Sequence, residues 1–310
     1  MSALFHERQV TEVLSEPCPK AGEAVLLAPE DMQEFVFPAG LQLPEPVEIK
    51  YDAVIDSTGP IGRTIRAEAG STVVVVLDHV GHTSLSETVE IIVEDDACLT
   101  VVAIQDWAPG AIHTAAHRAT IGAGAKLKHL MVTLGGDVVR ATVDASFTGE
   151  GGEVELDGLY FADAGQHLEH RIFVDHGPEN CKSRVTYKGA LQGEGAHAVW
   201  VGDVLIRATA EGTDTYELNR NLVLTDGARA DSVPNLEIET GQIEGAGHAS
   251  ATGRFDDEQL FYLMARGIRE EEARRLVVRG FFAELIQKIE IPELRERLLA
   301  AIERELGNED

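Results

Sequence analysis

The chain has 310 residues, more than one compact core usually accommodates, so its length predicts two domains or an elongated fold. Hydrophobic residues make up 44% and charged residues 25%, which is globular composition and argues against disorder. The formal net charge of −27 would repel nucleic-acid phosphates and anionic lipid headgroups, so it argues against roles on nucleic acids or membrane surfaces.

The first residues lack the charged-then-apolar layout of a signal peptide, and no stretch approaches the roughly 18 apolar residues of a membrane span. The three cysteines, Cys18, Cys98 and Cys181, are an odd number, widely separated and without a CxxC pair. They are typical of reduced thiols rather than of a disulfide framework. These features predict a cytoplasmic protein.

Residues 1–50 are expected to form a short lead-in, with a helix from Ala3 to Ser15 followed by proline-punctuated extended chain. From residue 51 to residue 253 the pattern is β, with short β-branched runs such as residues 71–77 bounded by turn residues. Small-residue corners are centred on residues 70, 97, 125 and 153, so they are spaced 27, 28 and 28 residues apart.

This regular spacing, without a helical period between the corners, predicts stacked β coils that bury a continuous apolar interior. The alternative is a β-sandwich, whose turns come about every 8–12 residues. Later corners at residues 195–196 and 227–229 keep the same chemistry but lose the spacing.

Residues 254–310 change to a helical pattern. A first helix begins at residues 256–259 and ends near Gly267, a second runs from Glu270 to Ile289, and a third begins at Pro292. The apolar stripe of the second helix is wider than the ~100° needed for one surface, so it predicts contact with two. The region is either an end cap of the β body or an arm that docks a partner, and the wide stripe favours docking.

On the docking interpretation, removal of the residues after Gly267 is expected to leave a soluble β body. The candidate docking residues are large apolar side chains of the first two helices: Leu260, Phe261, Leu276, Val277, Phe281, Phe282 and Leu285.

Several catalytic motifs are absent from the sequence. There is no G-x-x-x-x-G-K-[ST] phosphate loop, so we expect no nucleotide hydrolysis and no tightly bound nucleotide. There is also no G-x-S-x-G nucleophile elbow and no HExxH zinc helix. The sequence therefore predicts a protein that is not an enzyme.

Two groups of histidines could bind a metal. His113 and His117 are four apart and could share a helix face, but no Cys, Asp or Glu occurs between residues 107 and 126. The second group spans residues 167–176. On a strand, alternation would place His167 and Glu169 on one face and His170 on the other, which favours a hydrogen-bonded polar ladder over a metal site.

His248 stands apart from these groups, because residues 244–253 are otherwise mostly too small to bury it. An exposed imidazole just before a helical region can reach a partner or bind a metal. The alternative is an ordinary surface histidine.

Several segments resemble the SufB/SufD family of iron–sulfur cluster assembly scaffolds, from about residue 166 to residue 289. They are QHLEHR (166–171), YKG (187–189), NRNL (219–222), DGA (226–228), PNLEI (234–238), DDEQLFYL (256–263) and RGI (266–268). The resemblance implies a right-handed parallel β-helix with a C-terminal helical region that binds the SufC ATPase. It also implies that SufB and SufD pair through their β-helices and form a transient iron–sulfur cluster at that interface.

The histidine that SufD-type chains place at this interface falls on His248. SufB-type chains carry flanking glutamates and an upstream cysteine, whereas Gly247 and Ala249 flank His248 and no cysteine follows Cys181. The resemblance is therefore to SufD. Residues 1–50 are too few for the helical domain that SufD proteins usually carry, which leaves open a homodimeric scaffold without a separate SufB. A β-helical polysaccharide-acting enzyme and a simple metal-binding protein are the alternatives from other classes.

Overall fold

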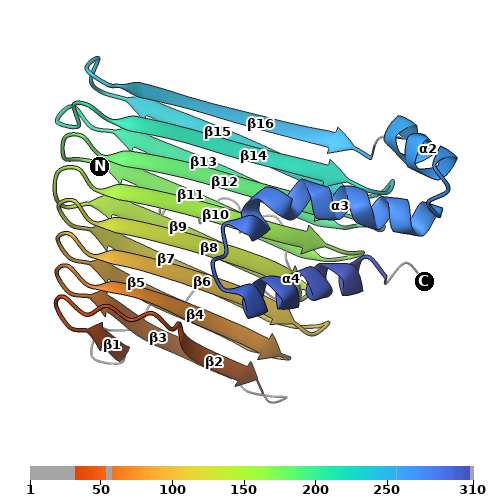
Figure 1. Ribbon diagram of the computed structural model, residues 1–310, viewed down its shortest axis with the longest axis horizontal. Coiled ribbons are helices and arrows are strands. Elements are labelled where there is room, and N and C mark those ends of the chain that lie inside the picture. The colour runs from red at the N-terminus through yellow and green to blue at the C-terminus, as the bar shows by residue number, and fades with distance from the viewer. Residues whose placement is uncertain (1–31, 54–57, 256, 308–310) are drawn as a thin grey trace.

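The computed structural model describes residues 32–53, 58–255 and 257–307, and the helix expected from Ala3 to Ser15 lies outside them. The described β strands form two eight-stranded sheets (Figure 1). Sheet A contains the odd-numbered strands: β1 (Gln33–Phe37), β3 (Thr58–Ala67), β5 (Ser84–Val93), β7 (Ile112–Ile121), β9 (Val138–Phe147), β11 (His167–His176), β13 (His197–Ile206) and β15 (Arg229–Ile238). Sheet B contains the even-numbered strands: β2 (Val47–Ala53), β4 (Thr72–Gly81), β6 (Cys98–Trp107), β8 (Lys126–Gly135), β10 (Glu153–Ala162), β12 (Lys182–Leu191), β14 (Asp214–Val223) and β16 (Gly245–Arg254).

Each strand pairs in parallel with strands one coil away, so the chain winds as a β-solenoid and the prediction of stacked coils is confirmed. Parallel neighbours throughout both sheets exclude the β-sandwich, whose sheets are antiparallel. Register partners are 26 residues apart where Thr72 faces Cys98, but 32 apart where Lys182 faces Asp214. The longer late coils explain why the later corners depart from the 28-residue spacing.

The corners recur because each uses backbone that only certain residues adopt easily. Asp96 and Gly124 both have positive φ, 58° and 61°. Glycine, and to a smaller degree aspartate, tolerates this left-handed region. The amide of Asp96 donates to the carbonyl of Ala123 one coil above at 2.8 Å, so each corner also supports its neighbour.

Alternation along the strands divides the side chains between the interior and the outer faces. On β9 every second residue, from Val139 to Phe147, is buried, and these residues belong to one apolar cluster that extends from Phe37 to Ala210. The interior also holds hydrogen-bonded polar groups. Tyr160 donates to Asn221 Oδ1 at 2.5 Å and accepts from Asn219 Nδ2 at 3.1 Å.

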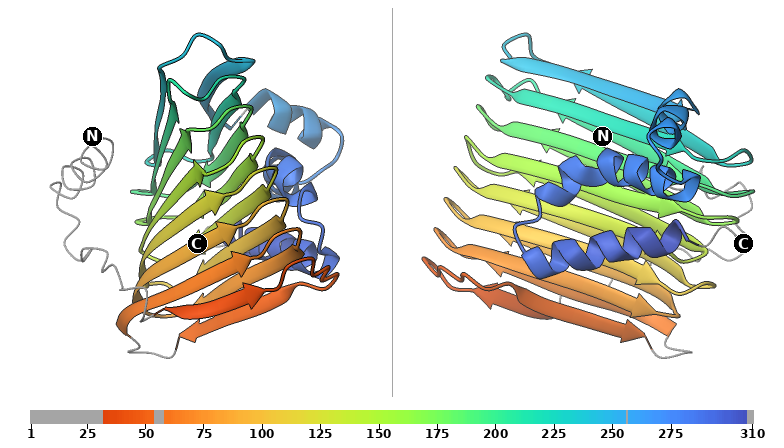
Figure 2. Two further views of the ribbon diagram at one scale, coloured as in Figure 1. Left: turned by 90° about the vertical axis from the view of Figure 1, so that its left-hand side faces the viewer. Right: turned by 45° about the vertical axis from the view of Figure 1, so that its right-hand side comes forward.

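Three helices follow the solenoid: α2 (Asp257–Ala265), α3 (Glu270–Gln287) and α4 (Pro292–Glu305). Figures 1 and 2 show them on the same side of the solenoid, with α3 and α4 lying across sheet B. They bury a second apolar cluster against the outer face of that sheet. Its members include Val102, Ile104, Leu130, Val132 and Phe161 from the sheet and Val278, Phe282, Leu285, Leu298 and Ile302 from the helices.

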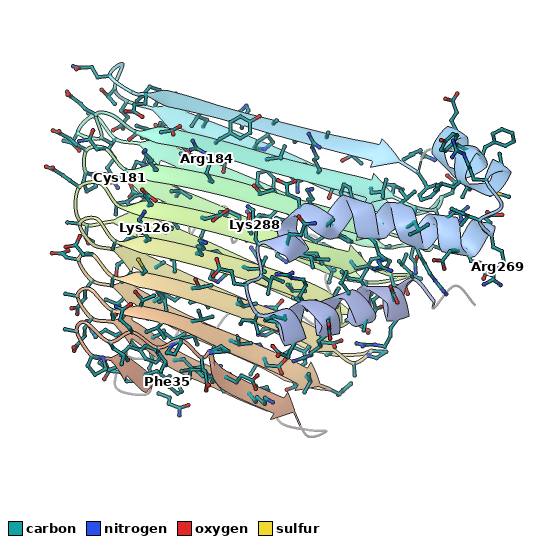
Figure 3. The ribbon with its side chains drawn as sticks, in the orientation of Figure 1. Phe35, Lys126, Cys181, Arg184, Arg269 and Lys288 are labelled. Carbon is teal, nitrogen blue, oxygen red and sulfur yellow. The ribbon has the colours of Figure 1, made fainter. Side chains whose placement is uncertain are left out.

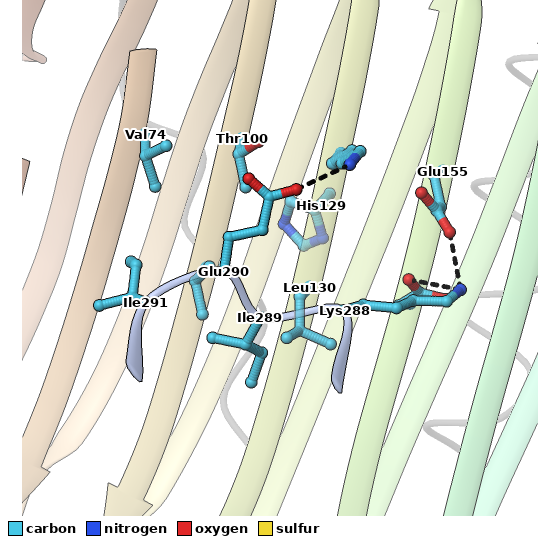
Figure 4. A pocket seen from close by; sticks show the side chains of 12 residues that line it. Val74, Thr100, His129, Leu130, Glu155, Lys288, Ile289, Glu290 and Ile291 are labelled. Carbon is cyan, nitrogen blue, oxygen red and sulfur yellow. Dashed lines mark hydrogen bonds and ion pairs between the residues drawn. The ribbon is translucent and has the colours of Figure 1, made fainter. Parts of the chain in front are cut away.

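Ion pairs also hold the helices to sheet B. Lys288, at the end of α3, donates to Glu155 at 2.7 Å and to Asp157 at 2.9 Å (Figures 3 and 4). On α4, Arg297 forms two bonds to Asp78 at 2.6 and 2.8 Å. Burial raises the pKa of Asp157 to about 7, although the nearby Lys288 acts in the opposite direction. The pocket beneath this contact measures only about 50 Å³, room for a few water molecules.

This packing accounts for the wide apolar stripe and corrects one expectation. Residues expected to contact a partner, such as Phe282, instead pack against the outer face of sheet B in the same chain. Removing the chain after Gly267 would expose that apolar face, so a soluble β body is no longer the expected result. None of the described helices is long and apolar enough to span a membrane.

Candidate site at the C-terminal end of the solenoid

His248 lies in β16, the strand that ends sheet B, and its side chain is exposed, as its small neighbours predicted. It pairs in register with Glu217 on β14. Because register partners on parallel neighbours project from the same face, His248 faces the same way as Glu217, toward the interior at the open end of the solenoid.

Glu217 is buried in that interior with 1% of its surface exposed. Neither of its carboxylate oxygens has a hydrogen-bond partner among the described residues. Burial raises the pKa of Glu217 to about 8, and the negative charge of Asp203 adds to the shift. Buried carboxyls without partners are costly and therefore call for an explanation.

Opposite Glu217, on β13 of sheet A, Gly202 leaves the space that the carboxylate occupies. A Cβ at position 202 would lie 2.7 Å from Glu217 Oε1 and would also overlap the ring of Trp200. The indole N–H of Trp200 is buried and has no hydrogen-bond partner among the described residues. The hydroxyl of Ser232, which pairs in register with Trp200 on β15, also lacks a partner there. Unpaired polar groups thus gather beneath His248.

A second polar cluster lies deeper, near the other end of the solenoid. His113 and His117 lie on strand β7, so the expectation that they share a helix face is wrong, but they still point inward together. Glu87 pairs in register with Ala115, midway between them, and Glu87 Oε2 lies 3.5 Å from His113 Nε2. His79 Nε2 lies 3.0 Å from the same oxygen.

Sequence reasoning missed Glu87 and His79 because they come from neighbouring coils rather than from the segment between residues 107 and 126. The 28-residue spacing was the signal that could have located them. Burial acts to raise the pKa of the Glu87 carboxyl. The charge of His79 and the hydrogen bonds that Glu87 forms with His79 and His113 outweigh burial and hold this pKa well below its usual value. Arg63 forms an ion pair with this carboxylate, so the negative charge of Glu87 is neutralised within the chain.

Along β11 the predicted alternation is confirmed. Glu169 and Arg171 form an ion pair on the outer face, and His167 contacts His197 there, with 3.1 Å between their Nδ1 atoms. His170 faces the interior, where its Nε2 lies 3.0 Å from the hydroxyl of Thr133. These contacts form the expected polar ladder. Within residues 32–53, 58–255 and 257–307, no group of three or more His, Cys, Asp or Glu side chains is arranged to hold a metal ion.

The candidate docking residues do not lie on one surface. Leu260, Phe282 and Leu285 are buried within the chain, and Val277 and Phe281 are half-buried. Phe261 on α2 is 74% exposed, and Leu276 on α3 is also exposed. Two residues that the sequence did not single out join the exposed set on α2, Tyr262 and Met264.

The family described as "SUF system FeS cluster assembly, SufBD core domain" matches residues 61–281. The chain is 61% identical over 272 residues to an "Iron-sulfur cluster assembly SufBD family protein" of Mycobacterium tuberculosis, and the match covers 86% of this chain and 68% of the relative. It is 31% identical over 173 residues to "Iron-sulfur cluster assembly protein SufD" of Escherichia coli, covering 56% of this chain and 40% of that protein.

A more distant SufBD family protein of Mycobacterium leprae is 27% identical over 258 residues, covering 81% of this chain and 30% of the relative. The matched family region includes the solenoid from β4 through β16 and extends into α3. The chain belongs to the SufBD family of iron–sulfur cluster assembly proteins.

Proposed function

We propose that this chain is a SufD-like, non-catalytic scaffold subunit of a cytoplasmic, ATP-driven iron–sulfur cluster assembly complex. Its open solenoid end pairs with a SufB-like subunit or a second copy of itself, and its helices dock a SufC-like ATPase. A transient iron–sulfur cluster forms at the paired end, with His248 as a ligand, and the chain itself holds no tightly bound nucleotide. The observation that carries the proposal is the exposed imidazole on the terminal strand of sheet B.

The terminal strand of sheet B supports pairing at this end, whereas that of sheet A is protected. β15 carries Pro234, which has no N–H to donate across an edge. β16 contains no proline, and Arg254 is its only residue among Asp, Glu, Lys and Arg. Natural edge strands that must stay unpaired usually carry prolines or charges. An edge that lacks this protection is suited to a partner, which here is a second SufBD solenoid.

Two further observations support the SufD-like assignment and the ATPase. Gly247 and Ala249 flank His248, so the acidic flanks of SufB-type chains are missing. The exposed apolar side chains of α2 lie on a helix none of whose described side chains belongs to the apolar cluster on sheet B. Exposed aromatic residues gathered on one short helix are a typical protein-docking feature.

His248→Ala tests the cluster site. Alanine has no lone pair to donate to iron, so the purified complex should carry several-fold less iron and sulfide than the unmodified complex. Folding and assembly should not change, since an exposed side chain contributes within about 0.5 kcal/mol to stability. His82→Ala, which removes an exposed histidine elsewhere on the solenoid, is the matched control. Normal iron and sulfide in a normally assembled His248→Ala complex would show that the cluster forms elsewhere.

Phe261→Glu tests the ATPase surface. This substitution places a charge on the most exposed large apolar residue of α2 but removes no interior contact. We expect at least a tenfold loss of ATPase recovered when the complex is purified, because truncating a docking hot spot costs about 2 kcal/mol or more. Val36→Glu, on exposed β1, is the control. ATPase recovery that is equal for both variants would exclude α2 as the docking surface.

A further inference from the structure

The unpaired groups beneath His248 lie close together in the last coils of the solenoid. Glu217 extends inward from β14 beside His248, and its carboxylate reaches the space that Gly202 leaves open on the opposite sheet. The ring of Trp200 borders the same space. The unpaired groups therefore come from both sheets, and they lie at the end of the solenoid where β15 and β16 are the last strands.

Several other buried polar groups of the described interior find partners across the coils. Glu87 is neutralised by Arg63 and contacts His79, and Asn219 and Asn221 bond with Tyr160. Both oxygens of Glu217 lack any such partner at 1% exposure. Leaving a buried acceptor unpaired costs about 1–3 kcal/mol, more for a charged group. A fold that keeps two unpaired acceptors next to its terminal strand leaves them available to a ligand bound there.

We propose that Glu217 and His248 together form a two-ligand site for a divalent first-row metal ion. Neighbouring strands lie about 4.8 Å apart, so register partners on one face can converge on one ion. A carboxylate oxygen and an imidazole nitrogen are both suitable ligands for ferrous iron. Two protein ligands leave coordination positions open for water or for residues of the partner subunit that pairs at this end.

The identity of the metal as iron rests on the proposed function, whereas the site itself rests on geometry. In the assembly complex, Glu217 would hold incoming iron against His248 before the cluster is complete. The competing interpretation is structural, in which Glu217 only fills the interior as a neutral acid. The two interpretations differ in whether Glu217 affects metal binding by the chain.

The test uses the isolated full-length chain and Co²⁺, an absorbing and fluorescence-quenching substitute for Fe²⁺, under anaerobic conditions. The chain contains two tryptophans, and the Trp200 ring lies next to the Glu217 carboxylate beside Gly202. We expect saturable quenching of its fluorescence at one ion per chain, together with visible Co²⁺ absorption. Glu217→Gln, which keeps the shape of the side chain, should weaken binding at least tenfold, and His248→Ala should do the same.

The controls separate this site from others. Glu237→Gln removes an exposed carboxylate on β15 and should leave the affinity unchanged. Trp200→Phe should abolish the quenching but keep the Co²⁺ absorption, which places the ion near that ring. Glu217→Gln that binds Co²⁺ as tightly as the unmodified chain would overturn the proposal, as would an unmodified chain that binds no ion.

The same variants distinguish failure of this inference from failure of the proposed function. If the complex requires His248 for its iron and sulfide but Glu217→Gln leaves Co²⁺ binding unchanged, the assembly function stands and the Glu217 site is wrong. If Co²⁺ binding requires both residues while His248→Ala complexes carry normal iron and sulfide, the metal site stands and the proposed cluster interface is wrong.

Discussion

Gly189→Val should lower the free energy of unfolding by at least about 3 kcal/mol, because overpacking of this severity exceeds what a buried site can absorb. A Cβ at position 189 would overlap the ring of Tyr160 inside the solenoid. That ring cannot readily move, since it stacks on His170 with 4.9 Å between centroids and its hydroxyl is bonded to Asn221. Urea unfolding followed by circular dichroism measures the effect.

Gly253→Ala is the control for this prediction, because nothing lies within 4 Å of the added Cβ on β16. Its stability should stay within about 0.5 kcal/mol of the unmodified chain. Combining Gly189→Ala with Tyr160→Leu should be less destabilising than the two single changes added together, because removing the ring relieves the overlap. Unchanged unfolding of Gly189→Val would show that the aromatic ring is free to repack.

Acidification from pH 7 to pH 4 should destabilise the chain by several kcal/mol. Burial lowers the pKa of His117, His170 and His176 to about 4, and it lowers that of His113 and His129 as well. In the unfolded chain these imidazoles titrate near pH 6.5. Between pH 6.5 and pH 4 these histidines bind more protons in the unfolded state, so their contribution to stability falls as the pH falls. Asp157 and Glu217, whose pKa values burial raises to about 7 and about 8, act in the opposite direction and offset part of this loss. Each of the three groups with a pKa of about 4 contributes at most roughly 3 kcal/mol of this loss.

The urea midpoint measured at each pH tests this expectation, and its slope against pH gives the number of protons taken up on unfolding. Replacing His170 with Gln removes one titrating group and should reduce the uptake by about one proton below pH 6. His82→Ala, an exposed control, should leave the urea midpoint at pH 7 unchanged. Stability that stays constant between pH 7 and pH 4.5 would mean that these histidines already carry protons in the folded chain.

The sequence by itself favoured the solenoid over a β-sandwich and predicted the faces of its strands. Corners at residues 70, 97, 125 and 153 depend on local backbone preferences, and alternation along residues 167–171 depends only on the two-residue period of a strand. Both properties belong to short segments, so they can be read without knowing which segments meet. The exposure of His248 was predictable for the same reason, because its neighbours in the chain are too small to cover it.

Only the tertiary structure decided which distant residues meet. Glu87 contacts His113, which lies one coil away. Glu217 pairs in register with His248, although 31 positions separate them in the sequence. Coil length varies from 26 to 32 residues, so a one-residue error in register would turn either carboxylate to the opposite face. The wide apolar stripe of α3 likewise indicated that the helix contacts two surfaces, but it did not identify them. One of these surfaces is the outer face of sheet B, with apolar residues such as Val102 and Leu130. Burial is non-directional and proportional to area, so a stripe alone cannot distinguish a partner from the chain's own sheet.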